Sequence, residues 1–242
     1  MAAIGLLPLA AFGVDVGGSL GLETGYQMNT LKETFDGGWE KVKDLNGMSL
    51  GMNGRLTIND FYMRAGGNYV WILQTPSYID SAGDTANLKK EHGFDAVGAI
   101  GYSFYFNNGE FSLAPEAGFS YQSLDLFTKI TENAGAPFVG FDFNWMFSSD
   151  WKFGLLCNWN FYGFRRSDVL SQSGKTERVT QGHYMGPEAK VAFDYSFTDN
   201  WSMGVAYRFK YLFTGKENVA GLTNEKQSWT TSHATLKVDY TF

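Results

Sequence analysis

Residues 185–211 read MGPEAKVAFDYSFTDNWSMGVAYRFKY, and this stretch decides the fold class of the 242-residue chain. Apolar and polar side chains alternate along it on both sides of a short polar turn at 198–200. A period of two residues is the pattern of a β-strand whose two faces meet different surroundings. Two such strands joined by a short turn predict an antiparallel hairpin.

The same alternation recurs along most of the chain and predicts an all-β protein with ten antiparallel strands. An even strand number returns the last strand to the side on which the first began, as in single-chain barrels of bacterial outer membranes. Eight strands is the alternative count, because the sixth predicted strand is short. The ten predicted strands are 14–27, 48–58, 61–71, 94–104, 111–122, 138–147, 151–161, 185–197, 201–211 and 233–242.

The apolar faces of these strands carry no Asp, Glu, Lys or Arg and are rich in Phe, Trp and Tyr. The interior of a barrel with eight to ten strands has too little room for so many aromatic side chains. Facing outward, they form a surface that suits lipid and not water. Closure of the sheet pairs every backbone group, which a bilayer requires. We therefore predict a closed, up-and-down transmembrane β-barrel. A soluble two-sheet sandwich is the alternative fold.

The predicted connections alternate between short polar turns and long charged loops. This alternation is typical of outer-membrane barrels with tight periplasmic turns and long external loops. Loops on a rigid scaffold commonly carry recognition, so a surface or host ligand is a predicted partner. The short turns are predicted at 59–60, 107–109, 148–150 and 198–200. The long loops are predicted at 29–46, 73–92, 123–137, 165–181 and 214–228, with charged and aromatic runs such as 39–43.

The overall composition excludes several classes of protein. Only 18% of residues are charged and the formal net charge is −6, which argues against nucleic acid as a partner because nucleic-acid binders carry a basic patch. No window of about 18 apolar residues exists, which excludes a bundle of transmembrane helices. One cysteine excludes both a disulfide framework and a cysteine-based zinc site.

The first thirteen residues, MAAIGLLPLAAFG, precede the first alternating stretch and are expected to lie outside the barrel. Ala11 and Gly13 stand where signal peptidase requires small side chains, so residues 1–13 are predicted to be a signal-peptide remnant. An apolar arm is the alternative, because a basic segment is missing. Residues 14–242 are then a single transmembrane β-barrel domain of an exported protein.

The polar faces of the strands are predicted to line the lumen. Charges packed into a narrow barrel should pair, because an unpaired buried charge costs several kcal/mol, roughly 3–5 by analogy with broken buried pairs. A salt-bridged core that plugs the barrel is the preferred interpretation, and a narrow polar pathway for small solutes is the functional alternative. The predicted lumen-lining residues are Glu23, Arg55, Arg64, Asp95, Glu116, Asp142, Lys152, Glu188, Lys190, Asp194, Arg208, Lys210, Lys237 and Asp239.

Aromatic residues gather beside the four short turns. Aromatic side chains are enriched where a membrane meets water, so these are predicted to form the girdle at the inner interface. The predicted girdle residues are Phe61, Phe104, Phe106, Phe111, Phe147, Trp151, Phe197, Trp201 and Phe242. The closing run, 236–242, resembles the last strand of Gram-negative outer-membrane proteins, which implies recognition by the barrel-assembly machinery.

Sequence motifs for enzymatic chemistry are missing. The chain contains no P-loop, dinucleotide fingerprint, HExxH, GxSxG or calcium-loop motif. None of the three histidines, His92, His183 and His233, has a second histidine at ligand spacing, so neither a metal nor a cofactor is predicted.

Ten strands in this loop order resemble the omptin proteases of the outer membrane, loosely and over about the last 150 residues. The similar segments are 87–95, 137–140, 189–191 and 240–242. The resemblance implies a protease with an aspartate pair on the second external loop and an Asp-x-His element on the fourth. A histidine and a carboxylate would there activate water.

The catalytic positions of that family are not matched in this chain. The second loop begins Trp71-Ile72-Leu73-Gln74-Thr75-Pro76 without an acidic pair, and Asp80 and Asp84 lack the family's spacing. His183 resembles the histidine of the fourth-loop element, but the residue two positions earlier is Gln181. We therefore predict that the protein is not an enzyme.

The sequence thus predicts an integral protein of a diderm bacterial outer membrane, with the lipid bilayer as its first partner. Its role is predicted to be a narrow channel for small solutes or a surface-exposed interaction protein, and the sequence does not decide between them. An omptin-like protease and a small barrel that binds hydrophobic compounds are the remaining alternatives.

Overall fold

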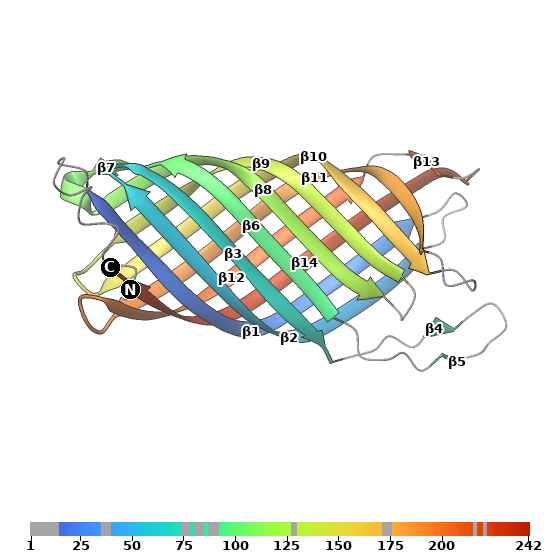
Figure 1. Ribbon diagram of the computed structural model, residues 1–242, viewed down its shortest axis with the longest axis horizontal. Coiled ribbons are helices and arrows are strands. Elements are labelled where there is room, and N and C mark those ends of the chain that lie inside the picture. The colour runs from blue at the N-terminus through green and yellow to red at the C-terminus, as the bar shows by residue number, and fades with distance from the viewer. Residues whose placement is uncertain are drawn as a thin grey trace.

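The computed structural model describes residues 15–34, 40–73, 78–79, 85–86, 92–126, 130–170, 176–214, 217–219 and 222–242. Within these ranges, ten strands lie side by side in chain order, each antiparallel to the next (Figure 1). They are β1 (Val16–Thr34), β2 (Glu40–Ile58), β3 (Phe61–Ile72), β6 (His92–Tyr102), β8 (Phe111–Leu126), β9 (Ile130–Met146), β10 (Trp151–Leu170), β11 (Thr176–Ser196), β12 (Trp201–Thr214) and β14 (Leu222–Thr241).

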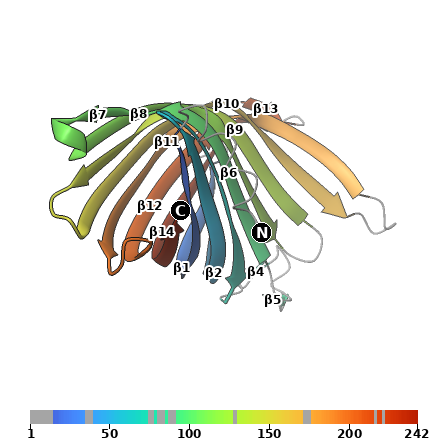
Figure 2. The same ribbon diagram turned by 60° about the vertical axis from the view of Figure 1, so that its left-hand side comes forward.

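The first and last strands close the sheet into a barrel. β1 pairs with β14 from Ser19↔Thr241 to Thr34↔Lys226, so the wall continues across this seam (Figure 2). The closed antiparallel barrel with up-and-down connections confirms the predicted fold class and the count of ten strands. The eight-strand alternative is wrong, and so is the two-sheet sandwich, because a continuous ring of paired strands leaves no second sheet.

The predicted short turns are confirmed at one end of the barrel. The 3₁₀ turn η2 (Asn107–Gly109) follows the short strand β7 (Phe104–Phe106), and both lie at the same end of the barrel as the C-terminus in Figure 1. Asn59, Asn107 and Asn108 have φ values of 52°, 50° and 56°. Asparagine tolerates this left-handed region, which explains its position in tight turns. We call this end the short-turn end and the opposite one the far end.

The extent of most predicted long loops is wrong. The structure continues β1 to Thr34 and begins β2 at Glu40, so most of the predicted loop 29–46 is strand. Strands likewise occupy most of 123–137 and 165–181 and much of 214–228, where β13 (Glu217–Val219) pairs with β14. Of the predicted loop 73–92, the described part contains the small hairpin of β4 (Tyr78–Ile79) and β5 (Thr85–Ala86).

The sixth barrel strand is also longer than predicted. β9 spans 17 residues, Ile130–Met146, instead of the short segment 138–147. Its first half lacks an apolar outward face, and alternation is therefore a poor guide to its start. Backbone pairing with β8 continues there nevertheless, to Leu126↔Ile130.

A belt of apolar side chains surrounds the barrel next to the short-turn end. On β3, Phe61, Met63, Tyr69 and Trp71 all point outward and are exposed. The ten residue steps from Phe61 to Trp71 rise roughly 33 Å, or roughly 23 Å along the axis at a tilt of about 45°. Outer-membrane barrels carry an apolar band of about this height, roughly 25 Å. No described helix is long and apolar enough to cross a membrane.

The wall has one marked irregularity, in β10 and β11. The register of these strands shifts between Asn160 and Gly163, where Tyr162 has a φ of 49°. Opposite this bulge Gly186 has a φ of 150°, and a Cβ there would lie 1.9 Å from the carbonyl oxygen of Tyr211. Only glycine fits this position, because any side chain would meet the backbone of β12.

The predicted signal segment, residues 1–13, lies outside the described residues. Its removal, and with it the division of the chain at residue 14, stays a prediction. The same holds for recognition of the last strand by the barrel-assembly machinery.

Candidate functional site

The barrel lumen gathers the charged residues that the sequence assigned to it. Twelve of the fourteen predicted residues line a cavity of about 250 Å³. The other two, Glu116 and Lys210, form ion pairs with cavity residues. The twelve are six acids and six bases, so the cavity is electrically balanced: Glu23, Asp95, Asp142, Glu188, Asp194, Asp239, Arg55, Arg64, Lys152, Lys190, Arg208 and Lys237.

The cavity extends towards the short-turn end. Its lining includes Asn144, Ser202 and Thr241, which come within a few residues of the short turns. Lys152 lies in the same region, and its side chain is 45% exposed. Water and small solutes on that side of the membrane therefore reach the cavity directly.

Several of the charged pairs in the lumen are close and strongly hydrogen-bonded. Arg64 donates from Nε and Nη2 to the two carboxylate oxygens of Glu116, at 2.8 and 2.6 Å. Tyr62 donates its hydroxyl to the same carboxylate at 2.9 Å. Arg55 donates to Asp142 at 2.9 Å. Paired, bidentate contacts of this kind satisfy both charges and fix their geometry.

One of these pairs bridges the whole lumen. Arg208 on β12 donates to Asp95 on β6 at 2.7 and 3.2 Å. In the ring of ten strands β6 and β12 are five steps apart, which places them on opposite walls. Asn68 also donates to Asp95, at 3.2 Å. The pair is therefore a strut across the barrel that leaves little width for a passage.

Next to the charged residues, on the side of the far end, lies a layer of neutral polar side chains. Gln122 on β8 donates to Thr231 on β14 at 2.8 Å, again between opposite walls. Ser49 and His233 share a hydrogen bond of 2.6 Å, and both side chains are buried. Lys210 donates to Ser120 at 3.0 Å and connects this layer with the charged one.

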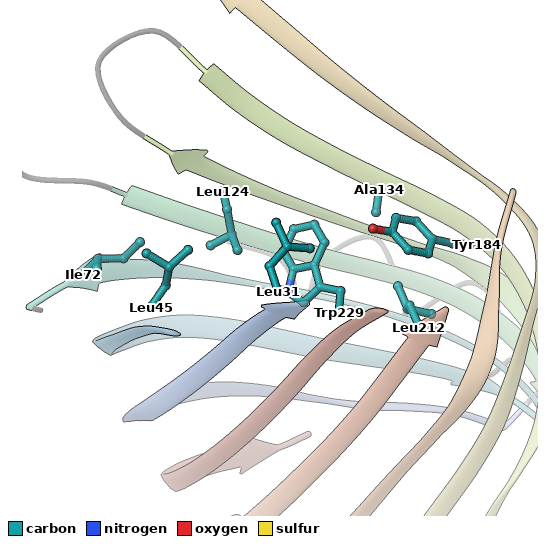
Figure 3. Close-up of a cluster of buried hydrophobic side chains, with 8 residues drawn as sticks. All are labelled: Leu31, Leu45, Ile72, Leu124, Ala134, Tyr184, Leu212 and Trp229. Carbon is teal, nitrogen blue, oxygen red and sulfur yellow. The ribbon is translucent and has the colours of Figure 1, made fainter. Parts of the chain in front are cut away.

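An apolar cluster fills the lumen towards the far end. Eight buried side chains from eight different strands meet there (Figure 3): Leu31, Leu45, Ile72, Leu124, Ala134, Tyr184, Leu212 and Trp229. Leu31 and Trp229 are directly opposite each other across the β1–β14 seam.

The apolar cluster was not predicted from the sequence, which assigned the lumen to the polar faces of the strands and named charged residues as its lining. The apolar cluster corrects the prediction of a purely polar lumen. The spacing in the sequence was the available signal. Leu31 is an even number of residues from Glu23 and Gln27 and therefore lies on the same inward face of the strand. Recognising it required knowing that β1 continues beyond residue 28.

The predicted girdle residues all lie beside the short turns. Eight of the nine side chains are exposed on the outer surface, and Phe111 is half-buried. Neighbouring rings contact one another, as in the stacked Phe111–Trp145 pair at 5.8 Å between centroids and the Phe147–Trp151 pair at 6.5 Å. Their role at a membrane interface stays a prediction.

Of the histidine and aspartates compared with the omptin site, His183 is the one whose side chain the described part of the structure includes. His183 lies in β11, exposed, with its ring 6.2 Å from that of Tyr162. Asp80 and Asp84 lie outside the described residues. Among the described residues, no group of three or more His, Cys, Asp or Glu side chains is arranged to hold a metal ion.

Several solved outer-membrane barrels are similar to this chain. One is OprG from Pseudomonas aeruginosa, with a TM-score of 0.39, 11% identity, and 93% and 96% of the two chains covered. Another is Ail, the attachment invasion locus protein of Yersinia pestis, with a TM-score of 0.35, 12% identity, and 93% and 99% of the two chains covered. A third is the Pseudomonas putida toluene transporter TodX, with a TM-score of 0.33, 8% identity, and 91% and 89% of the two chains covered. No curated protein sequence matches.

A match to a sequence-family model identifies the chain more specifically than the similarity to these structures does. The model described as "Pom: Protochlamydia outer membrane protein" matches residues 35–242. The match covers most of the chain and all but the first of the ten barrel strands. The predicted location in the bacterial outer membrane, with the lipid bilayer as partner, is thereby confirmed. The chain belongs to the Protochlamydia outer membrane protein family.

Proposed function

We propose that this protein is a closed outer-membrane barrel that presents its far end at the cell surface as an interaction scaffold, without conducting solutes. The observation that carries the proposal is the filling of the lumen at successive levels. The Arg208–Asp95 strut, the Gln122–Thr231 bridge and the apolar cluster follow one another along the axis.

The energetics of the lumen favour a permanent closure. Opening a pathway would separate buried ion pairs, and each broken pair costs about 3–5 kcal/mol when one charge is left uncompensated. It would also expose the side chains around Trp229 to water, at about 25 cal/mol per Å² of apolar area. Both costs exceed thermal energy many times.

The length of the strands supports a role at the far end. A tilted strand crosses a bilayer with about 9–11 residues, whereas β10 and β11 have 20 and 21. Their pairing continues to Leu170↔Thr176. Since short turns of such barrels face the periplasm, the surplus strand length supports a proposal in which the far end extends outside the cell.

Planar-bilayer recording tests the closure. We expect the refolded protein to insert without discrete conductance steps. Insertion is verified independently by heat-modifiable migration on a gel, since a folded barrel runs differently before and after boiling. Regular steps of conductance from a verified, folded preparation would overturn the proposal.

Cysteine labelling in intact cells tests the orientation. In a Cys157→Ser background, a membrane-impermeant maleimide should label Asp44→Cys, an exposed position of β2 towards the far end. The matched variant Asp150→Cys, in a short turn, should stay unlabelled until the outer membrane is permeabilised. Labelling of Asp150→Cys alone would show the reverse orientation and would remove the argument for surface presentation.

A narrow pathway for small solutes is the second candidate function. The charge-balanced cavity of about 250 Å³, open at the short-turn end, favours it. This candidate predicts small, discrete conductance steps or solute uptake into vesicles, so the recording described above distinguishes it from a closed scaffold.

A further inference from the structure

Two ion pairs in the lumen are longer than the others. Lys190 Nζ lies 3.8 Å from Glu23 Oε2, and Lys210 Nζ lies 4.0 Å from Glu188 Oε2. Most other ion pairs of the lumen lie at 2.6–3.1 Å, and Lys152–Asp194 lies at 3.6 Å. A separation near 4 Å exceeds the range of a hydrogen bond. The ammonium and carboxylate groups therefore attract each other without forming a hydrogen bond.

Besides Asp194 Oδ1, which forms an ion pair with Lys237, three buried polar atoms of the cavity lining make no hydrogen bond to a described protein group: Glu23 Oε2, Asn68 Oδ1 and Arg208 Nε. Glu23 is only 8% exposed, and its Oε2 accepts no hydrogen bond within the described part of the chain. The Nε of Arg208 likewise donates to no described protein group. A buried polar atom that makes no hydrogen bond is costly, by about 1–3 kcal/mol. The lining therefore contains two acceptors and one donor whose hydrogen bonds the described protein groups do not make.

The charge balance of the cavity restricts the kind of molecule. Its lining contains six acidic and six basic side chains. A lone cation or anion would leave the lining with an uncompensated charge in a partly desolvated site, which is unfavourable. A molecule that carries one positive and one negative group preserves neutrality and reaches both Glu23 and Lys190.

The size and access of the cavity are also restrictive. A volume of about 250 Å³ equals the share of roughly eight water molecules in the liquid, at about 30 Å³ each. That space admits a molecule of amino-acid size. Lys152 and Thr241 lie at its entrance near the short turns, so such a molecule enters from that end.

We propose that the cavity binds a small zwitterionic solute, whose ammonium group donates to Glu23 and whose carboxylate accepts from Lys190. The cavity is bounded by the Arg208–Asp95 strut and opens towards the short-turn end, so the site does not require a conducting lumen. The proposed solute site therefore does not depend on the closed-scaffold function. A binding experiment tests the solute site, whereas a conductance experiment tests the closed scaffold.

Binding of β-alanine to the refolded barrel in detergent micelles tests the proposal by calorimetric titration. Propylammonium and propionate are controls of similar size, each with one of the two charges. We expect β-alanine to bind roughly tenfold or more tightly than either control, the value of one charge-assisted hydrogen bond. Propionate or propylammonium binding as tightly as β-alanine would refute a zwitterion site, as would no detectable heat from a folded preparation.

Matched variants identify the site. Glu23→Gln keeps the shape of the side chain but removes its charge, and we expect a roughly tenfold or greater loss of β-alanine affinity. Glu110→Gln removes the same charge from an exposed turn at the same end and should bind like the native protein. Lys190→Met tests the carboxylate contact if Glu23→Gln does not fold. Equal affinity of the folded site variants and the native protein would overturn the assignment.

Discussion

Individual side chains of the inner wall act in pairs whose members come from distant parts of the sequence. Asp95 and Arg208 are 113 residues apart, yet their hydrogen bonds join opposite walls. Glycine makes room for such contacts. A Cβ at Gly204 would lie 2.1 Å from Oδ1 of Asp194, and the carboxylate that occupies this space pairs with Lys237 at 2.8 Å. Part of the high glycine content thus serves the packing of charges against a bare backbone.

The Arg208–Asp95 strut predicts a strong asymmetry between single and double substitutions. Arg208→Met leaves the Asp95 carboxylate buried without its partner and should lower the free energy of unfolding by about 3–5 kcal/mol. The double variant Arg208→Met with Asp95→Leu removes both charges and should recover much of that loss. Equilibrium unfolding in urea, with the protein in lipid vesicles, measures both. A single variant within 1 kcal/mol of the native protein, as for an exposed pair, would show that the strut contributes little.

At the scale of the element, each barrel strand has two segments with different surroundings. Close to the short-turn end the outward residues are apolar, as Met203 and Val205 are on β12. Further along the strands, outward positions include Thr30 and Thr230, which face each other across the seam. The alternation of apolar residues therefore marks the belt and not the strand, which explains why the predicted strands end too early.

The belt predicts that an outward charge is costly only at the middle of the bilayer. Ala65→Arg, on the exposed face of β3 within the belt, should lower the free energy of unfolding in lipid by about 2–4 kcal/mol. Thr230→Arg, on the outer face of β14 towards the far end, should cost about 0–1 kcal/mol. Unfolding in vesicles of defined thickness compares the two. Equal costs at the two positions would mean that the belt does not mark the membrane.

At the scale of the whole molecule, closure depends on one seam between the two ends of the chain. Tyr26 on β1 lies directly opposite Ala234 on β14, and both side chains face outward. The backbone hydrogen bonds between Gly18 and Phe242, at 2.9 and 3.1 Å, complete the seam at the short-turn end. Without this pairing, β1 and β14 would be edge strands with unpaired polar groups in lipid.

The seam predicts a specific crosslink. In a Cys157→Ser background, Tyr26→Cys with Ala234→Cys should form a disulfide under mild oxidation, because directly opposed residues of antiparallel strands have Cα atoms about 4.5–5.5 Å apart. The pair Ala65→Cys with Ala234→Cys, on strands that are not neighbours, is the control. Migration on a denaturing gel without reductant detects the closed loop. Crosslinking of the control but not of the seam pair would contradict the closure.

The prediction from sequence was strongest where one local rule holds along a whole segment. The alternation in 185–211 sufficed for strands, and the position of turns such as 198–200 was predictable because turn residues act through their own backbone. The same period of two residues predicted that charged side chains such as Glu23 and Arg208 face the lumen. The start of β9 was not predictable, because its outward positions lie beyond the belt and carry no apolar signal.

The sequence by itself determined that this chain is a transmembrane barrel with an apolar outside and a polar, charged inside, and it favoured ten strands over eight. Only the tertiary structure decided which charges pair, which of them stay 3.8–4.0 Å apart, and that an apolar cluster around Trp229 fills the far end of the lumen. The physical reason is that face and turn depend on near neighbours in the chain. Contacts across the lumen depend on the register and closure of the whole ring, to which every strand contributes.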